Sequence, residues 1–217
     1  MMRFKGISVV LGLLALLATA CWPGPPPSEL TYFAPYEAAI EAGSNLPGTG
    51  IRYVGLSDSR AEVLIDGQRT FKQKGDSLDW EGSPAEGASV DLSLRILWYT
   101  AEKLHVAGTA KVRVSNPAPQ AAPIPTEAPI QYSNAPVAYN VARDKYIPGT
   151  LVKYLGKEKE GAHLEGVEGH PYRKIADSIV WEGKLRENVY LRLNLRVLFI
   201  TEDTLRVGGM ATIWITP

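Results

Sequence analysis

Apolar and polar residues alternate along two stretches of the chain with a period of two, which is the pattern of a half-buried β-strand. Residues 90–98 place five large apolar side chains on one face, with polar side chains between most of them, and residues 191–199 repeat this arrangement. After a short turn, a second stripe of small and apolar residues follows each stretch, at residues 104–114 and 205–215. Because short connections join antiparallel neighbours, the pattern predicts two β-meanders.

Both meanders belong to a sequence repeat with a shift of 101 residues. Between Pro47 and Asn116, 21 of 70 positions are identical to their counterparts 101 residues later, without a gap. Self-similarity at a fixed shift is the signature of a duplicated structural unit. We therefore predict an all-β fold with two tandem copies of an antiparallel β-meander of about 70 residues, each a small barrel or a curled sheet of about five strands. The alternative is one ten-stranded barrel built from both copies.

Proline-rich segments lie before and between the repeats and divide the chain. The predicted organisation is a signal peptide at 1–20, a lipid-anchored proline-rich stalk with a short lead-in helix at 21–46, repeat 1 at 47–116, a proline-rich linker at 117–146 and repeat 2 at 147–217. The lead-in helix is predicted from Tyr36 to Ala42, because Pro35 precedes it and Gly43 follows it.

One end of each long strand departs from simple alternation. Residues 96–99 and 197–200 are apolar on both faces of the predicted strand. A strand end that is apolar on both faces calls for a second packing partner. We therefore expect the two repeats to pack against each other at these ends, near Leu97 and Leu198.

The first twenty residues have the pattern of a secretory signal peptide. Arg3 and Lys5 precede an uncharged, mostly apolar stretch from Gly6 to Ala20, which is too short to span a bilayer comfortably. The stretch ends in Ala18-Thr19-Ala20-Cys21, and at this point the chain resembles a bacterial lipoprotein precursor.

The resemblance implies that Cys21 carries a diacylglyceryl lipid with fatty acyl chains such as palmitate and becomes the mature N-terminus. It also implies a location on the extracytoplasmic face of the cell membrane, or of the outer membrane if the host has one. An unmodified Cys21 would instead make the protein freely secreted or anchored by a helix.

The composition excludes several classes of function. With 23 basic and 23 acidic side chains, the formal charge is zero, which argues against a dedicated nucleic-acid-binding protein. A single cysteine excludes an intrachain disulfide and a cysteine-cluster metal site. His163 and His170 are seven residues apart and could share a metal with Glu165 or Glu168, but zinc sites normally have closer ligand pairs. We predict no metal site and no cofactor.

Candidate contact residues recur at equivalent positions of both repeats. They are Tyr53, Trp80, Glu81 and Arg95 in repeat 1, and Tyr154, Trp181, Glu182 and Arg196 in repeat 2. In a hairpin each Glu falls on the same face as the Arg of its own repeat, which predicts a cross-strand ion pair. The alternative is a ligand-facing pair. The aromatic side chains are in phase with the apolar stripes, which favours core packing over stacking on a sugar or a lipid.

No catalytic constellation is present in the sequence. It contains neither a G-x-S-x-G nucleophile turn nor a glycine-rich phosphate loop before a helix. We therefore predict that this is not an enzyme but a binding or scaffolding module of the cell envelope, which holds a partner protein, a glycan or a lipid. One alternative is a carrier of a small apolar ligand in a barrel interior. Another is an envelope hydrolase with an unrecognised site around Glu81 and Glu182.

Overall fold

The structure is a computed structural model that describes residues 28–216, so the predicted signal peptide and Cys21 lie outside the described residues. Residues 28–216 contain no helix, and so none that is long and apolar enough to cross a membrane. Repeat 1 contains β1 (Glu29–Glu41), β2 (Ile51–Ser57), β3 (Arg60–Ile65), β4 (Gln68–Lys72), β5 (Ser77–Ala85), β6 (Ala88–Tyr99) and β7 (Lys103–Ser115). Repeat 2 contains β9 (Ile130–Ala142), β10 (Lys145–Tyr146), β11 (Lys153–Glu158), β12 (Gly161–Glu165), β13 (Tyr172–Arg173), β14 (Ser178–Arg186), β15 (Val189–Ile200) and β16 (Thr204–Ile215), and β8 (Gln120–Ala121) lies between the repeats.

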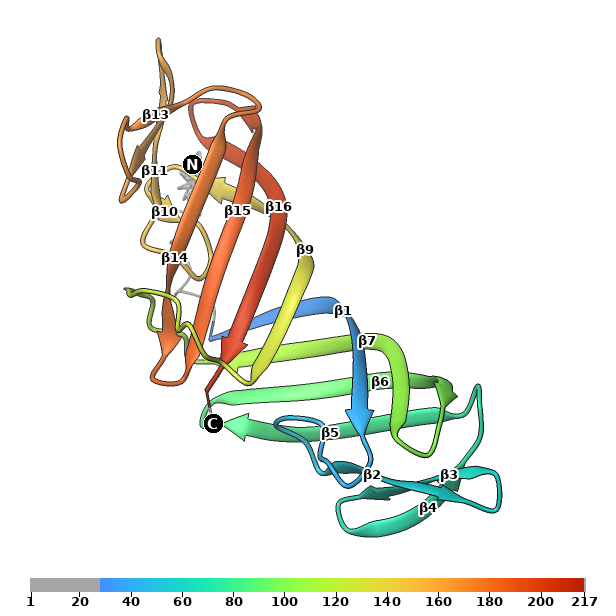
Figure 1. Ribbon diagram of the computed structural model, residues 1–217. Helices are drawn as coiled ribbons and strands as arrows, with labels where there is room; N and C mark the ends of the chain where they lie inside the picture. Colours follow the sequence, from blue (N-terminus) through green and yellow to red (C-terminus); the bar gives the residue numbers. More distant parts are fainter. Residues whose placement is uncertain (1–27, 217) are drawn as a thin grey trace, which may run out of the picture.

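The predicted all-β fold of curled antiparallel sheets is confirmed. Each repeat has one large sheet, ordered β1-β7-β6-β5 in repeat 1 and β8-β14-β15-β16-β9 in repeat 2 (Figure 1). A small second sheet accompanies each, β2-β3-β4 and β10-β11-β12-β13. None of these sheets closes into a barrel, so the single ten-stranded barrel is wrong. The reason is that β1 and β9 lie next to each other but belong to separate hydrogen-bonded sheets.

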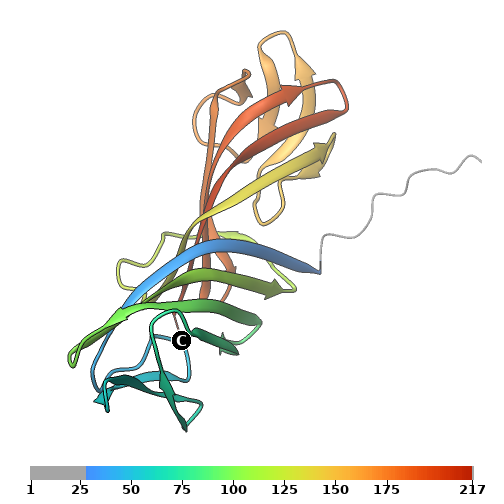
Figure 2. The same cartoon turned by 90° about the vertical axis from the view of Figure 1, so that its right-hand side faces the viewer.

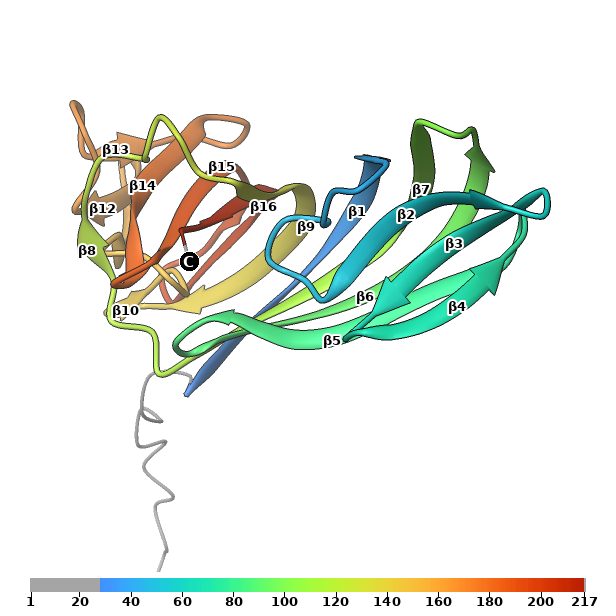
Figure 3. The same ribbon diagram turned by 60° about the horizontal axis from the view of Figure 1, so that its bottom comes forward.

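The core of each repeat lies between its large sheet and its small sheet. Figure 3 shows β2, β3 and β4 extended across β5 and β6. Every second side chain of β6 faces the core, as the period of two predicts. Val90, Leu92 and Leu94 are buried completely or almost completely. The equivalent leucines of β15 are equally buried, and the buried side chains of both repeats form one continuous core.

The repeated Pro-Gly-Thr motif is a tight turn at the start of each small sheet. Thr49 N donates to Leu46 O at 3.1 Å, and Gly48 at the third position has a φ of +72°. Proline at the second position and a left-handed glycine at the third are the signature of a type II turn. Gly149, with a φ of +79°, occupies the same place in repeat 2. The turn brings the chain from the first strand of each repeat onto the face of the large sheet.

The predicted lead-in helix from Tyr36 to Ala42 is wrong, because these residues lie in or directly after β1. β1 pairs with β7 without interruption from Glu29 to Glu41. The glutamates and alanines favour a helix locally, but pairing over thirteen residues outweighs the weak preference of a seven-residue segment.

The segment 117–146, predicted as a linker, contains β9 and the short strands β8 and β10. β9 is the counterpart of β1, so each structural repeat begins before the Pro-Gly-Thr turn. Pro35 and Pro136 lie in these two strands, each of which is an edge strand of its large sheet, where a proline is tolerated.

The two repeats meet where β1 and β9 lie side by side (Figure 2). The contact is reciprocal. Leu30 of β1 packs on Gly149 of repeat 2, since a Cβ placed on Gly149 would lie 3.0 Å from the Leu30 Cδ1 atom. Ile130 of β9 packs on Gly48 of repeat 1, where a Cβ would lie 2.2 Å from the Ile130 Cδ1 atom. Each repeat therefore places the first strand of its sheet against the turn of the other repeat.

The expected packing of the repeats at Leu97 and Leu198 is wrong. Leu97 is 45% exposed and Leu198 is 49% exposed. A β-bulge shifts the register between Ile96 and Trp98, and the same irregularity recurs in β15. Because a bulge adds one residue to a strand, it moves the following side chains out of the buried phase. The apolar strand ends therefore face solvent rather than a second partner.

Candidate functional site

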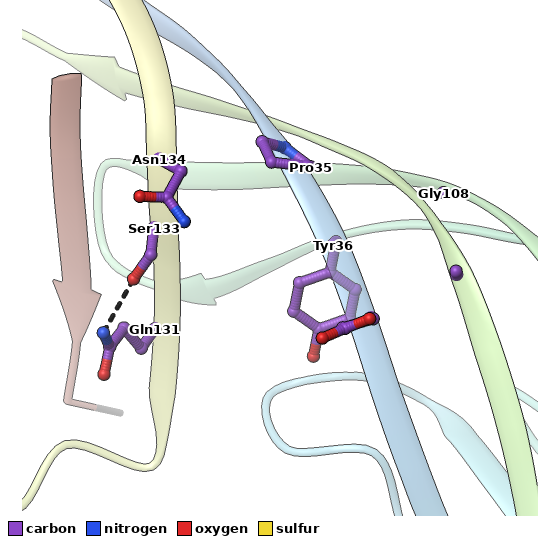
Figure 4. Close-up of a pocket in the computed structure, with 8 residues that line it drawn as sticks. Pro35, Tyr36, Gly108, Gln131, Ser133 and Asn134 are labelled. Carbon is purple, nitrogen blue, oxygen red and sulfur yellow. Dashed lines mark hydrogen bonds between the residues drawn. The ribbon is translucent and has the colours of Figure 1, made fainter. Parts of the chain in front are cut away.

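An open groove runs along the junction of the repeats and has a volume of about 520 Å³. Its walls come from three strands, β1, β7 and β9 (Figure 4). The lining residues are Pro35, Tyr36, Glu37, Ala107, Gly108, Gln131, Ser133 and Asn134. The Tyr36 ring of β1 lies 5.5 Å from the Tyr132 ring of β9 between centroids, and in the view of Figure 4 the bonded Gln131 and Ser133 side chains lie on the side of the β9 ribbon away from Tyr36. Both repeats therefore contribute to one surface depression.

A β-bulge in β9 shapes one wall of this groove. Ser133 and Asn134 together oppose the single residue Thr212 of β16, and Asn134 has a left-handed φ of +59°. The other bulges of the large and small sheets occur in pairs, at equivalent positions of the two repeats. In β1, by contrast, the register is continuous. The extra residue in β9 is thus the one register irregularity within residues 28–216 that the duplication does not explain.

Several kinds of hydrogen-bonding group and one aromatic ring line the groove. Gln131 Nε2 donates to Ser133 Oγ at 2.7 Å, which orients both side chains. Asn134 adds an amide and the exposed Glu37 adds a carboxylate. These groups can stack against a ring and exchange hydrogen bonds with hydroxyl groups.

Four tyrosines of β1 and β9, Tyr32, Tyr36, Tyr132 and Tyr139, lie close together at the junction of the repeats. The Tyr36 and Tyr132 rings are 5.5 Å apart between centroids and tilted by 42°. Burial, and then the charge of the neighbouring Tyr36, raise the pKa of Tyr132. Burial also raises the pKa of Tyr139 to about 12, although the neighbouring Tyr32 lowers it in part. Burial, with a further contribution from Tyr139, raises the pKa of Tyr32. These phenols are neutral at physiological pH and serve to join the two repeats.

Tyr53 and Tyr154, predicted as candidate contact residues, are fully buried at equivalent positions of the two cores. The Tyr53 hydroxyl donates to the Thr100 carbonyl, and the Tyr154 hydroxyl donates to the Thr201 carbonyl. Burial and the neighbouring Tyr99 raise the pKa of Tyr53. Burial also raises the pKa of Tyr154. The core-packing interpretation is confirmed for both tyrosines, and neither is accessible to a ligand.

Trp80 and Trp181 also pack within their own repeats. Each ring covers the glycine two residues later in its strand, because a Cβ on Gly82 would lie 2.3 Å from Trp80 Cζ2 and one on Gly183 would lie 2.6 Å from Trp181 Cζ2. Trp181 is 7% exposed, whereas Trp80 is half-buried and donates its indole N–H to Asp66 Oδ1 at 3.1 Å. The repeated Trp-Glu-Gly motif is thus a packing motif.

The predicted cross-strand pair of Glu81 with Arg95 is wrong. Glu81 Oε1 lies 2.7 Å from Arg113 Nη2, on the far side of β6, while Arg95 Nη1 donates to the Gly75 carbonyl at 3.0 Å. The register explains the difference, because β6 places Asp91, not Arg95, directly opposite Glu81.

Repeat 2 also lacks the predicted pair, but its glutamate finds a different kind of partner. Glu182 pairs at 2.6 Å with Arg192, which lies directly opposite on β15, and Arg196 donates to the Ser178 hydroxyl and the Ala176 carbonyl. The eight recurring candidate residues therefore do not assemble into one site.

His163 and His170 lie in a small network with Glu158 and Tyr172. His163 Nδ1 is 2.8 Å from Glu158 Oε1, and the Tyr172 hydroxyl donates to the other oxygen of Glu158 at 3.1 Å. The hydrogen bond to Glu158 raises the pKa of Tyr172. His170 contacts the backbone of Tyr172. Residues 28–216 contain no group of three or more metal-ligating side chains that could hold an ion.

The residues of the groove were missed by the sequence analysis. One signal in the chain points to them. Ala34 and Pro35 match Ala135 and Pro136 at a shift of 101 residues, but Tyr32 matches Tyr132 at a shift of 100. The change in shift marks one inserted residue between these positions, and that residue belongs to the bulge of β9.

Comparison with protein-family models, with curated proteins and with solved structures returned no match.

Proposed function

We propose that this protein is a non-catalytic binding module, displayed on the extracytoplasmic face of a membrane by a lipid on Cys21, and that its ligand binds in the groove between the repeats. The unmatched bulge of β9 carries the proposal. A duplicated unit needs no extra residue at this place, since β1 forms the same edge without one. Bulges and left-handed non-glycine residues concentrate at functional sites, where they re-aim side chains.

The lining favours a saccharide of the cell envelope as the ligand. A sugar ring has an apolar face, which the half-buried Tyr36 ring can cover, and hydroxyl groups around its rim. Gln131 and Asn134 offer amide donors and acceptors, Ser133 a hydroxyl and Glu37 a carboxylate acceptor. The groove is open along its length, so it suits an extended glycan better than a small molecule that needs enclosure.

The two alternative functions have less support. A carrier of an apolar ligand needs an enclosed interior, but the sheets do not close into barrels and their inner faces are packed with buried side chains. A hydrolase around Glu81 and Glu182 needs two carboxylates that flank a substrate. Each of these carboxylates instead pairs with an arginine of its own repeat.

Binding of cell-wall glycan tests the groove. The probe is soluble glycan released from the host cell wall, titrated calorimetrically into the protein. Asn134→Gly removes the side chain but accepts the left-handed backbone, and Gln131→Ala removes the second amide. We expect each change to weaken binding about tenfold, which is the effect of one or two hydrogen bonds.

Two matched controls leave the groove intact. Asn116→Gly replaces another left-handed asparagine, with a φ of +47°, and Gln68→Ala replaces an exposed glutamine of β4. Both controls should bind like the unaltered protein. If the groove variants also bind unchanged, the groove is not the site. If the unaltered protein does not bind the glycan, the proposed ligand class is wrong.

The anchor requires a separate experiment. The intact mass of the protein from native membranes should exceed that of the chain beginning at Cys21 by a diacylglyceryl group. Cys21→Ser should abolish this added mass and release the protein from the membrane. An unmodified Cys21 on the membrane-derived protein would contradict the anchor but would leave the groove proposal standing.

A further inference from the structure

The two large sheets differ in what covers the edge that lies farthest from the groove. β5 forms this edge in repeat 1, and β14 is its counterpart in repeat 2. An edge strand presents a row of unpaired backbone N–H and C=O groups to any extended chain that approaches it. β14 is partly covered by β8, which comes from the segment between the repeats. Within residues 28–216, no strand covers β5.

The cover on β14 is a short antiparallel strand addition. Gly183 pairs with Ala121, Lys184 pairs with Gln120, and Ala118 N donates to the Leu185 carbonyl at 2.8 Å. The approach is close, because a Cβ on Gly183 would lie 2.3 Å from the Gln120 carbonyl oxygen. The protein therefore already contains one example of an extended segment bound at this edge.

β5 retains the features that allow this pairing. Gly82 occupies the place of Gly183, so a backbone can approach equally closely. Pro84 occupies the place of Leu185, which contributes its carbonyl oxygen to the bond with the added segment. Proline has the same carbonyl, and its missing N–H leaves no donor unpaired. Trp80, which lies on the same strand, is also more exposed than its buried counterpart in repeat 2.

Charge distinguishes the two edges and points to the kind of segment that fits β5. Asp79 and Glu81 both project from the outer face of β5, whereas their counterparts in β14 are Val180 and Glu182. Arg113 pairs with Glu81, and no ion pair involves Asp79 in the described part of the chain. Two β5 strands from two copies of the protein would bring these carboxylates together on one face, which is unfavourable. A strand with basic side chains on that face is favoured.

We propose that the free edge of β5 binds an extended segment of a partner protein as an added antiparallel strand, with Lys or Arg on the face of Asp79 and Glu81 and apolar residues on the face of Trp80. Backbone hydrogen bonds supply the affinity in such strand addition, and alternate side chains supply the specificity. The site is independent of the groove, which lies at the opposite edge of the same sheet.

A capped octapeptide of alternating lysine and valine is the test probe. Its binding is followed by amide hydrogen exchange and by the resonance of the Trp80 indole N–H in NMR spectra of the purified protein. At saturation, we expect at least tenfold slower exchange of edge-facing β5 amides and a shifted Trp80 resonance. The same peptide with alternate N-methylated residues, and a glutamate–valine peptide, should bind at least tenfold more weakly. Equal binding of the N-methylated peptide, or unchanged exchange in β5, would overturn the proposal.

Charge reversal on the strand provides the second arm of the test. Asp79→Lys should weaken binding of the lysine–valine peptide at least tenfold, and Val180→Lys at the equivalent exposed position of β14 should leave it unchanged. Asp79 is exposed, so the fold should tolerate the change, and Asp79→Asn provides a milder second variant with an expected threefold loss. Unchanged affinity in both Asp79 variants would overturn the assignment of a basic partner segment.

Discussion

Repeats 1 and 2 share their framework down to its irregularities. Each has a type II Pro-Gly-Thr turn, a buried tyrosine bonded to a threonine carbonyl and a tryptophan packed on a glycine. Each also has three β-bulges at equivalent positions, including those at Gly55 and Gly156. Bulges that are present in both copies after the duplication are regular features of the unit rather than defects.

The differences between the repeats lie at the edges of the large sheets. β9 contains an extra residue that β1 lacks, and β14 has the cover of β8 that β5 lacks. The interior side chains are similar at almost every position, whereas Asp79 and Val180 are chemically unlike at matched positions. The comparison teaches that the core preserves the fold in both copies, and that the edges are where each copy acquires its own contacts.

The reciprocal contact between the repeats predicts that they unfold together. Leu30→Ala and Ile130→Ala each remove a buried side chain that packs on the turn of the other repeat. We expect each to lower the free energy of unfolding by about 2–5 kcal/mol. Urea denaturation followed by circular dichroism measures the loss, with Leu56→Ala at a 46% exposed site as the control. Two separate unfolding transitions, with only one of them shifted by either variant, would contradict a core shared by the two repeats.

The tyrosines of the junction predict a loss of stability at alkaline pH. Tyr139 has a pKa of about 12 in the folded protein, against about 10 when unfolded. Below pH 10 the phenol is neutral in both states and has no effect. Above pH 10 the unfolded state loses the proton first, so stability falls by about 1.4 kcal/mol per pH unit until the folded pKa is reached.

Tyr139→Phe should remove this part of the pH dependence, measured as the free energy of unfolding between pH 9 and 12. Tyr146→Phe, at a 57% exposed position, is the matched control and should leave the profile unchanged. An identical alkaline profile for Tyr139→Phe and the unaltered protein would show that the junction does not hold this phenol neutral.

The hydrogen bonds of the two buried tyrosine hydroxyls are predicted to contribute equally to the stability of the two repeats. Tyr53→Phe and Tyr154→Phe each leave a threonine carbonyl without its donor. We expect each to cost about 1–2 kcal/mol of stability. Thermal unfolding of the two variants should show equal losses, since the bonds are equivalent. A loss confined to one repeat would indicate that the carbonyl of the other repeat finds a replacement donor.

The exposed strand ends predict the smallest effect. Leu97→Asp and Leu198→Asp place a charge at positions that already face solvent. We expect the free energy of unfolding to change by no more than about 0.5 kcal/mol in either variant. A loss of several kcal/mol in chemical denaturation would mean that these leucines pack against a partner surface in solution.

Much of the framework was predictable from the chain, and most of the groove was not. The alternation in β6 and β15 identified their buried faces correctly as far as Ile96 and Val197. The prediction of buried side chains then failed at Leu97 and Leu198, because the pattern of apolar residues does not indicate where a β-bulge occurs. Tyr53 and Tyr154 were correctly interpreted as core residues, whereas Glu81 was assigned the wrong partner. That error arose because the pairing depends on the register of β5 against β6, which side-chain type alone does not specify.

The all-β class, the duplication and the buried faces of the strands follow from the sequence. They depend on local or periodic patterns of residues, and each repeat contains these patterns independently of the other. The strand identity of residues 36–41 and the meeting of β1 with β9 depend instead on contacts between segments about 60 to 100 residues apart. A short segment rich in Glu and Ala favours a helix until a thirteen-residue ladder with β7 is available to it. Long-range pairing supplies hydrogen bonds and burial that exceed local preference, so these features exist only in the assembled fold.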